Sequence, residues 1–407
     1  MGIPRIERTE YLERLIAFRE KQLIKVITGV RRCGKSTLLE IYQDYLRKEG
    51  VSEKQILAVN LEDFDFYELR EPAKLHSYLK ERLADEMMTY VFLDEVQQCE
   101  DFPRVVDSLY LRKNVDLYVT GSNAKMLSSD IATLLSGRYV EISMLPLSFQ
   151  EYVDSTGGRD DLSRKYRAYI ENSSFPYALD LTGQPKEIRD YLEGIYNTIV
   201  IKDIAIRHRF PDTMMLESIT RFVFDNIGNQ LSTKKIADTM TSSGRKIDVK
   251  TVEKYLQALM DSFIVYQAKR YNVKGKQYLK TQDKYYVVDV GMRSMLLGSR
   301  GMDVGHILEN VIYLELLRRG YDVYVGKVDM LEVDFVAMDQ RGVMYYQVAE
   351  TVRAKETLLR ELAPLQKIAD HYPKLILTLD DDPEADYEGI RRVNALDWLM
   401  GTVEGTY

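Results

Sequence analysis

The chain has 407 residues, of which 45% are hydrophobic and 29% charged, a balance typical of a soluble globular protein with more than one domain. The net charge is −7, so the chain as a whole is not a basic nucleic-acid-binding protein, and any basic site has to be local. Two cysteines, Cys33 and Cys99, exclude a disulfide scaffold and a cysteine-built zinc site. No apolar run has the length of a signal peptide or a membrane span, so we expect a cytoplasmic protein with no membrane partner.

Over the first part of the chain, short apolar runs alternate with helical patterns. Apolar strands separated by helices are typical of a parallel α/β sheet with both faces covered. The runs are residues 24–27, 56–59, 91–93 and 117–119. This alternation predicts a parallel sheet in the first part of the chain.

Beyond this sheet the pattern changes three times, and we expect a multidomain α/β protein. The residues after 160 are mostly helical and are broken by prolines, as in a helical lid or linker. Two helical patterns and a hairpin-like stretch follow, and then a helix, three strands, another helix and a last strand. The predicted segments are 1–159 for the parallel-sheet core, 160–228 for the helical lid, 229–298 for the helix–helix–hairpin segment and 299–407 for a small α/β domain.

A complete phosphate-binding motif follows the first predicted strand. Residues 29–36 read Gly-Val-Arg-Arg-Cys-Gly-Lys-Ser and match G-x-x-x-x-G-K-[ST], with a strand before and a helical pattern after. In such a loop the backbone N–H groups surround phosphate oxygens, Lys35 reaches the β- and γ-phosphates, and Ser36 binds Mg²⁺. We therefore expect ATP and Mg²⁺ as cofactors. The residues expected at the nucleotide are Gly29, Val30, Arg31, Arg32, Cys33, Gly34, Lys35, Ser36 and Thr37.

A later apolar strand ends in two acids, Asp94 and Glu95. After a complete phosphate loop, this pattern predicts that Asp94 holds Mg²⁺ through water and that Glu95 orients or activates the attacking water. A catalytic glutamate favours hydrolysis over passive nucleotide storage. Without the loop, the same pattern would indicate only the end of a strand.

Two further residues are candidates for the same chemistry. Asn123 follows the strand over 117–120, and parallel sheets bind ligands at the carboxyl ends of their strands, so it would contact the γ-phosphate or the attacking water. The alternative for Asn123 is a polar turn. Arg138 is a candidate arginine finger, which would come from a neighbouring subunit or a moving segment, and the alternative is an ordinary surface arginine.

Together these motifs resemble a prokaryotic branch of the AAA+ ATPases that carries a C-terminal domain of unknown function. The resemblance rests on Gly-Val-Arg-Arg-Cys-Gly-Lys-Ser-Thr, Phe-Leu-Asp-Glu-Val-Gln, Thr-Gly-Ser-Asn, Ser-Gly-Arg and Leu-Pro-Leu-Ser-Phe, in this order. It implies the phosphate, magnesium and water roles given above, a sensor role for Asn123 and a finger role for Arg138. It also implies self-association into a homo-oligomer.

The segment 229–298 predicts a winged helix-turn-helix, since two helices, a glycine turn and a β-hairpin follow one another. Residues 231–284 contain twelve Lys/Arg and five Asp/Glu, a local charge of +7 in a chain of net −7. Contact with DNA phosphates requires such a concentration of charge, while the alternative is a protein-packing module with a solvated basic face. The candidate DNA contacts are Lys250, Lys254, Lys274, Lys276 and Lys280.

The C-terminal segment is similar to the restriction-endonuclease-like nuclease fold, in which a helix Glu, a strand Asp and a following Glu-x-Lys bind metal and activate water. Glu309 and Asp334 match the first two positions, but Gln347 and Ala349 stand where the Glu and the Lys should be. A neutral amide is a poor ligand for a hard cation, and alanine cannot support a hydroxide. Lys355 could replace the missing lysine. We expect a degenerate nuclease-like site rather than an active nuclease.

The principal hypothesis is an ATP-hydrolysing protein that engages DNA through the winged helix and the degenerate tail. The alternative is a nucleotide-dependent switch or scaffold that binds a protein partner, and very slow turnover would favour it. A third hypothesis is an ATP-gated DNA nuclease, which Gln347 and Ala349 oppose.

Overall fold

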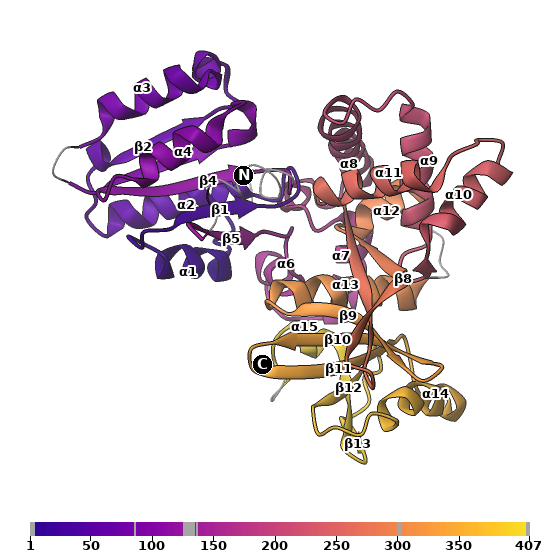
Figure 1. Cartoon of the computed structure of the whole chain (residues 1–407). Helices are drawn as coiled ribbons and strands as arrows, with labels where there is room; N and C mark the ends of the chain where they lie inside the picture. The colour runs from indigo at the N-terminus through magenta and orange to yellow at the C-terminus, as the bar shows by residue number, and fades with distance from the viewer. Residues whose placement is uncertain (1–4, 85–86, 125–134, 136, 299–302, 404–407) are drawn as a thin grey trace. The chain divides into compact units, whose positions relative to one another are not determined.

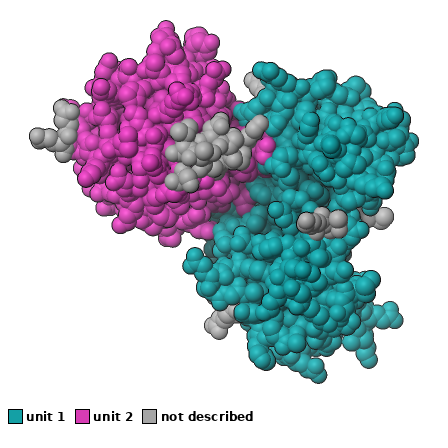
Figure 2. All heavy atoms as spheres, viewed as in Figure 1, with its two compact units in different colours: residues 1–3, 147–260, 264–407 teal, residues 4–146, 261–263 magenta. Residues whose placement is uncertain are grey.

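The structure is a computed structural model of the chain (Figure 1), and it describes residues 5–84, 87–124, 135, 137–298 and 303–403, apart from the side chains of Lys202, Lys280 and Thr281. The chain forms two compact units, which Figure 2 shows in different colours. Unit 2 comprises residues 4–146 and 261–263, and unit 1 comprises residues 1–3, 147–260 and 264–407. Within the described residues, no helix is long and apolar enough to cross a membrane.

Unit 2 is built around a five-stranded parallel sheet with the strand order β2-β3-β4-β1-β5. The predicted parallel α/β sheet is therefore confirmed. Strand β5 has no apolar run that would predict it, because it lies at the edge of the sheet and most of its side chains are partly or fully exposed. The elements are α1 Thr9–Ala17, β1 Ile24–Thr28, α2 Lys35–Lys48, η1 Glu53–Gln55, β2 Ile56–Asn60, η2 Phe64–Arg70, α3 Pro72–Arg82, β3 Thr89–Asp94, η3 Val96–Gln98, α4 Phe102–Tyr110, β4 Val115–Gly121 and β5 Tyr139–Ser143.

Helices cover both faces of this sheet because its central strands are apolar on both sides (Figure 1). Val91 and Leu93 of β3 pack with buried side chains of α3 and α4. The intervening Phe92 faces α2, where its ring centroid lies 6.1 Å from that of Tyr42. Burial of both faces stabilises the sheet and leaves the carboxyl ends of its parallel strands along one edge, where ligands bind.

Unit 1 combines helices with a nine-stranded mixed sheet of order β13-β14-β12-β11-β10-β9-β7-β8-β6. Its first four α-helices precede all of its strands in the chain. The elements are α6 Phe149–Ser155, α7 Leu162–Asn172, η5 Pro176–Leu181, α8 Pro185–Asn197, η6 Thr198–Ile206, α9 Thr213–Asp225, β6 Gln230–Leu231, α10 Thr233–Ser242, α11 Val249–Asp261, β7 Val265–Asn272, β8 Gln277–Val287, α12 Val290–Leu297, α13 Val304–Arg318, β9 Asp322–Val328, β10 Leu331–Asp339, β11 Gly342–Ala349, α14 Lys355–Gln366, β12 Lys374–Thr378, β13 Ala385–Tyr387, β14 Ile390–Asn394 and α15 Ala395–Leu399.

The nine-stranded sheet joins two segments that the sequence pattern separates. Strand β7 pairs in parallel with β9, with Arg270 opposite Val325 and Asn272 opposite Lys327. The hairpin of the predicted segment 229–298 and the strands of the predicted tail domain therefore share one sheet. Pairing between strands that are distant in sequence leaves no periodic signal in either strand, so the pattern alone does not predict it.

The two compact units divide the chain at residues 146–147, within the predicted core segment 1–159. The cause is helix α6, whose aromatic side chains pack against the helix that follows it. The ring centroid of Phe149 lies 5.7 Å from those of both Tyr166 and Tyr169 in α7, in edge-to-face contacts. Such contacts add to the apolar burial between the two helices, and α6 therefore belongs to unit 1.

Two parts of unit 1 differ in extent from the sequence prediction. Strands β7 and β8 reach residues 272 and 277, so the loop that joins them is short and contains Lys274 and Lys276. Strand β12 corresponds to the predicted last strand, and after it the chain forms two more strands and a helix that the pattern does not predict. Strand β13 has 3 residues and strand β14 has 5, which is too short for a clear alternation.

Candidate functional site

The phosphate-binding motif forms the turn between β1 and α2 in unit 2. Gly29 has a φ of 150°, and a Cβ atom there would lie 2.1 Å from the carbonyl oxygen of Met144, so only glycine fits. Gly34 has a φ of 105° and directly precedes Lys35, the first residue of α2. The loop therefore ends at a helix N-terminus, where backbone N–H groups favour a phosphate.

The other loop residues differ in exposure. Val30 and Cys33 are buried and anchor the loop in the core of unit 2. Arg32, Ser36 and Thr37 have exposed side chains. The loop thus offers a ligand both polar side chains and backbone N–H groups.

Lys35 carries a buried positive charge, with 3% of its side chain exposed. Its ammonium donates hydrogen bonds to the carbonyl oxygens of Gly29 and Val30, at 3.0 and 3.2 Å, and lies 3.7 Å from Oε1 of Glu95. The loop therefore holds the ammonium next to the acidic end of β3. Because charge-assisted hydrogen bonds to phosphate are strong, this position suits the role predicted from the motif.

Asp94 ends β3, and its Oδ1 accepts a hydrogen bond from the Thr120 hydroxyl of the neighbouring strand β4. The same hydroxyl accepts a hydrogen bond from the Glu95 backbone N–H at 3.0 Å. Burial raises the pKa of Asp94 above its usual value, although hydrogen bonds from Ser36 and Thr120 lower it. A buried carboxyl group beside the Ser36 hydroxyl fits a hard cation such as Mg²⁺, which prefers oxygen ligands.

Glu95 is held by polar side chains on either side of it. Its Oε2 accepts hydrogen bonds from Ser122 Oγ, at 3.1 Å, and from the side-chain amide of Gln97. Burial by itself raises the pKa of Glu95, but the charges of Lys35 and Arg31 outweigh this effect and hold the pKa below its usual value. Glu95 is therefore ionised, which is the form that accepts a proton from water.

The two other predicted catalytic residues have different surroundings. Asn123 follows β4 and is buried, with 2% of the residue exposed. Arg138 donates a hydrogen bond to Asp107 Oδ1 at 2.5 Å and lies over the ring of Tyr110, so in this chain its contacts are with α4. The structure thus brings Lys35, Asp94 and Glu95 together, while Arg138 is engaged elsewhere.

Thr120 and Gln97 contact the two acids and are not among the predicted site residues, although both lie within motifs that carry the family resemblance, Thr-Gly-Ser-Asn and Phe-Leu-Asp-Glu-Val-Gln. The available signals are weak: a hydroxyl at the carboxyl end of a buried strand, and an amide two residues after Glu95. Both residues hold carboxylates in place, so each contributes to the site through the group that it positions.

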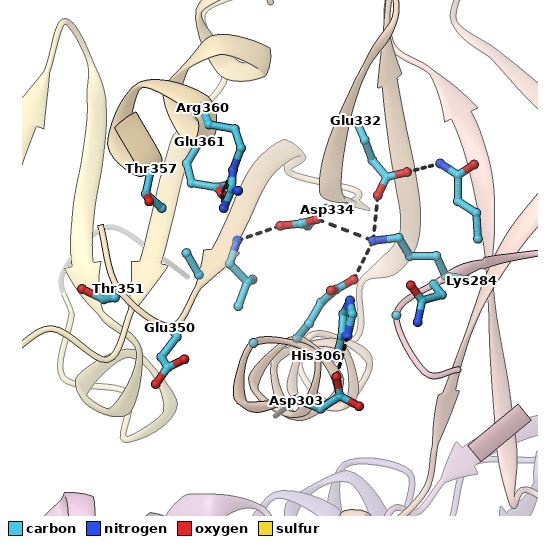
Figure 3. A pocket seen from close by; sticks show the side chains of 17 residues that line it. Lys284, Asp303, His306, Glu332, Asp334, Glu350, Thr351, Thr357, Arg360 and Glu361 are labelled. Atoms are coloured by element: carbon cyan, nitrogen blue, oxygen red, sulfur yellow. Dashed lines mark hydrogen bonds and ion pairs between the residues drawn. The ribbon is translucent and has the colours of Figure 1, made fainter. Parts of the chain in front are cut away.

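A second candidate site is a pocket of about 690 Å³ in unit 1 (Figure 3). Its lining includes the predicted nuclease-like residues Glu309 of α13 and Asp334 of β10, together with Glu332 of β10 and Glu361 of α14. Gln347 of β11 links two of these, because its Oε1 accepts from the Asp334 N–H at 2.8 Å and its amide donates to Glu361 at 2.7 Å. The predicted residues Glu309, Asp334 and Gln347 therefore lie together.

The lysine in this pocket is Lys284 of β8, whereas the sequence analysis named Lys355 as the residue that could replace the missing lysine. Lys355 is exposed at the start of α14 and is not among the lining residues of this pocket. Lys284 is only 4% exposed. Its charge therefore does not contribute to a basic surface over residues 231–284. The signal in the sequence is one charged residue directly before the apolar residues 285–288.

Asp334 has an abnormal ionisation. Burial and the neighbouring Glu309 raise the pKa of Asp334 to about 8, although Lys284 and the Val348 N–H lower it. The unfolded chain would release this proton near pH 4, whereas the folded chain retains it up to about pH 8. The folded state therefore binds more protons in this window, and the contribution of Asp334 to stability decreases as the pH rises.

Replacing Asp334 with asparagine should remove this dependence, because an amide does not ionise. We expect the free energy of unfolding of Asp334→Asn, relative to the natural chain, to increase between pH 5 and pH 8 by up to about 1.4 kcal/mol per pH unit. Urea-induced unfolding at several pH values measures it. Asp322→Asn, at an exposed position on β9, is the control and should follow the natural chain. Parallel pH profiles for all three proteins would contradict the raised pKa.

The predicted DNA contacts lie on two elements of unit 1. Lys250 and Lys254 are exposed on α11, and Lys276 is exposed in the turn between β7 and β8. Lys274, in the same turn, forms an ion pair with Asp329 at 2.7 Å. The side chain of Lys280 lies outside the described residues. Helix α11 therefore presents two of the described candidates on one element.

The parallel sheet, the phosphate loop and the acid pair at its carboxyl edge define a P-loop NTPase fold in unit 2. A family model supports this assignment, since residues 21–153 match the AAA domain. Residues 163–303 match a domain of unknown function (DUF8612). The resemblance to AAA-type ATPases is confirmed for the AAA domain, and the nuclease-like tail lies outside both matches.

Comparison with curated proteins identifies full-length relatives. An uncharacterized protein of Haemophilus influenzae is 38% identical over 401 residues, which cover 97% of this chain and 98% of the relative. An uncharacterized protein of Methanocaldococcus jannaschii is 28% identical over 380 residues, covering 88% and 82% of the two chains. The chain therefore belongs to the family of the Haemophilus influenzae protein and carries an AAA domain.

Solved structures with partial similarity are more distant. AMPPCP-bound DnaA from Aquifex aeolicus is 13% identical with a TM-score of 0.33, covering 64% of this chain and 89% of DnaA. A chain in the structure of Drosophila ORC bound to AT-rich DNA and Cdc6 is 12% identical with a TM-score of 0.27, covering 72% and 91%. These scores are too low to carry an argument about this chain.

Proposed function

We propose that this protein binds ATP with Mg²⁺ and hydrolyses it at the site in unit 2. The observation that carries the proposal is the ionised Glu95 beside the phosphate loop, with its carboxylate 3.7 Å from the Lys35 ammonium. A phosphate loop alone would support nucleotide binding. A buried, ionised glutamate at the same edge of the sheet supplies the base that hydrolysis of a phosphoanhydride requires.

The described residues divide the chemistry among them. Lys35 would hold the β- and γ-phosphates, and Ser36 and Asp94 would hold Mg²⁺, which neutralises charge on the phosphate oxygens when it is bound. Glu95 would orient water and accept its proton, while Gln97 and Ser122 hold the carboxylate in position. The sensor role of Asn123, and the finger role of Arg138 in a homo-oligomer, remain part of this proposal.

We also propose that α10 and α11 with the β7–β8 hairpin form a winged helix that engages DNA. Buried side chains on one side of α11 support this, because Val252, Tyr255 and Leu259 pack inward while Lys250 and Lys254 stay exposed. The tail beyond residue 303 would be a degenerate nuclease-like domain, with Glu309 and Asp334 retained. Both parts then contribute to a DNA-coupled ATPase.

Steady-state ATP hydrolysis by the pure full-length chain, with and without double-stranded DNA, tests the two proposals together. We expect hydrolysis at a rate that DNA increases. A hydrolysis rate that DNA does not change would contradict the winged-helix proposal but not the ATPase proposal. Negligible hydrolysis with retained ATP binding would remove the ATPase and favour a nucleotide-dependent switch that binds a protein partner.

Reversing the charge of the two exposed lysines of α11 tests directly whether this helix contacts DNA. In Lys250→Glu/Lys254→Glu we expect affinity for a short DNA duplex to fall at least about tenfold, because two phosphate contacts become repulsive. The slope of log affinity against log salt should decrease by about two. Fluorescence anisotropy at several salt concentrations measures both quantities.

The matched control changes total charge equally at another place. Lys48→Glu/Lys80→Glu alters two exposed lysines of α2 and α3 in unit 2 and should leave DNA affinity within about twofold of the natural chain. Equal losses in both double variants would mean that only net charge matters, and the assignment of α11 as the DNA-contacting helix would be wrong.

A further inference from the structure

Three carboxylates converge on one ammonium group in the pocket of unit 1 (Figure 3). Lys284 Nζ lies 2.8 Å from Glu309 Oε1, 2.8 Å from Glu332 Oε1 and 3.6 Å from Asp334 Oδ1. The Tyr286 hydroxyl also donates to Glu309 Oε1, at 2.6 Å. Lys284 and Glu309 are nearly inaccessible to water, with 4% and 7% of their side chains exposed. A buried charge requires such partners, and this ammonium satisfies several carboxylates at once.

The carboxylates come from the elements that would bind a metal ion in a nuclease-like site, but their present partners do not leave a metal position. Within the described residues, no group of three or more His, Cys, Asp and Glu side chains is arranged to hold a metal ion. The Gln347 oxygen accepts from the Asp334 backbone N–H, so it is already used inside the sheet. Asp334 Oδ2 accepts from the Val348 N–H at 2.9 Å. A divalent cation therefore does not fit this pocket beside Lys284.

The ammonium itself stands where the positive charge of a metal ion would be needed. It comes from β8, which reaches the carboxylates because β8 and β10 belong to the same nine-stranded sheet. The buried Lys284 side chain carries one fixed charge that cannot dissociate into solvent as a metal ion does. The chain itself thereby compensates the negative charge of Glu309 and Glu332, and the charge that Asp334 acquires when it loses its proton above about pH 8.

We propose that Lys284 is the resident cation of this pocket, replacing the divalent metal ion of a nuclease-like site, so that the natural chain binds no metal ion there. The ammonium also ties β8 to α13 and β10 and stabilises the junction between the predicted winged helix and the tail. The pocket therefore does not catalyse metal-dependent phosphodiester cleavage. Lys284 is one cause, in addition to the replacement of a Glu and a Lys by Gln347 and Ala349. This inference is independent of ATP hydrolysis.

Manganese binding by the nucleotide-free, full-length chain tests the proposal without any activity assay. Titration calorimetry with Mn²⁺ should give the same result for the natural chain and for Asp334→Asn, because the pocket takes no metal in either. In Lys284→Met the carboxylates lose their cation, and we expect a new site that binds Mn²⁺ at least about tenfold more tightly than the natural chain does. The double variant Lys284→Met/Asp334→Asn should lose this site.

Two controls keep the result decisive. Lys284→Arg retains a positive charge and should bind no additional Mn²⁺. If Lys284→Met fails to fold, the comparison of the natural chain with Asp334→Asn still decides. Mn²⁺ binding by the natural chain that Asp334→Asn removes would overturn the proposal, and so would a folded Lys284→Met with no new Mn²⁺ site. Neither outcome touches the proposed ATPase, whose residues lie in unit 2.

Discussion

Replacing Glu95 with glutamine should lower the rate of ATP hydrolysis by about 10²–10⁴-fold, the usual contribution of a positioned base, while ATP binding is retained. The side chain keeps its shape and can still contact Ser122, but an amide cannot accept a proton from water. Removing the negative charge 3.7 Å from the Lys35 ammonium also leaves that ammonium more available to phosphate. We therefore expect ATP to bind Glu95→Gln at least as tightly as it binds the natural chain.

Two measurements on the same protein check this prediction: steady-state phosphate release, and equilibrium titration with a fluorescent ATP analogue. The matched control is Glu100→Gln, an exposed glutamate beyond the same strand, which should hydrolyse ATP at the natural rate. A Glu95→Gln protein that retains the natural rate would show that another group, or a contaminating enzyme, performs the hydrolysis. Loss of binding together with the rate would mean that Glu95 supports the loop instead of the chemistry.

Replacing Lys35 with alanine should weaken ATP binding on the order of a hundredfold, and hydrolysis would be lost with it. The ammonium is the buried positive charge that the loop presents, and removing one partner of a buried charged contact costs about 2–5 kcal/mol. At about 1.4 kcal/mol per tenfold change in affinity, this range includes the expected loss. The result differs from that of Glu95→Gln, in which binding survives.

Lys48→Ala is the control for Lys35→Ala because it lies on the same helix, at its exposed C-terminal end. It should bind ATP with the natural affinity. Lys35 also donates to the carbonyl oxygens of Gly29 and Val30, so thermal unfolding should be followed in parallel to exclude collapse of the loop. Retained ATP affinity in a folded Lys35→Ala protein would contradict the role of the loop in phosphate binding.

The two sites differ in how much charge the chain supplies by itself. In unit 2, Asp94 and Glu95 lie beside a loop whose ammonium and N–H groups attract an anionic ligand, so binding such a ligand is favourable there. In unit 1, the carboxylates of the pocket already have Lys284 as their partner. A site with satisfied charges has little to gain from a metal ion, which is why we place the chemistry in the AAA domain.

Local features of the sequence were enough to predict the phosphate loop and the acid pair of unit 2. The phosphate loop is continuous in sequence, and Gly29 and Gly34 occupy backbone conformations that a short stretch of chain requires. Asp94 and Glu95 follow a strand whose apolar run marks it as buried on both faces. Because parallel strands bring their carboxyl ends to one edge, the order of strand and motif already implied that loop and acids would meet.

The residues that complete the two sites are brought together by contacts between segments that are distant in sequence. The motifs that contain Thr120 and Gln97 do not assign them to the acids, which they contact through side-chain geometry, and Lys284 reaches Glu309 only because strands distant in sequence join one sheet. Alternation along a strand indicates that a side chain is buried, but it does not indicate which strand lies beside it. Local sequence was therefore sufficient for the phosphate loop, the acid pair and the four apolar strands β1 to β4 of the parallel sheet, whereas the long-range pairing of β7 with β9 brings together the residues of the pocket.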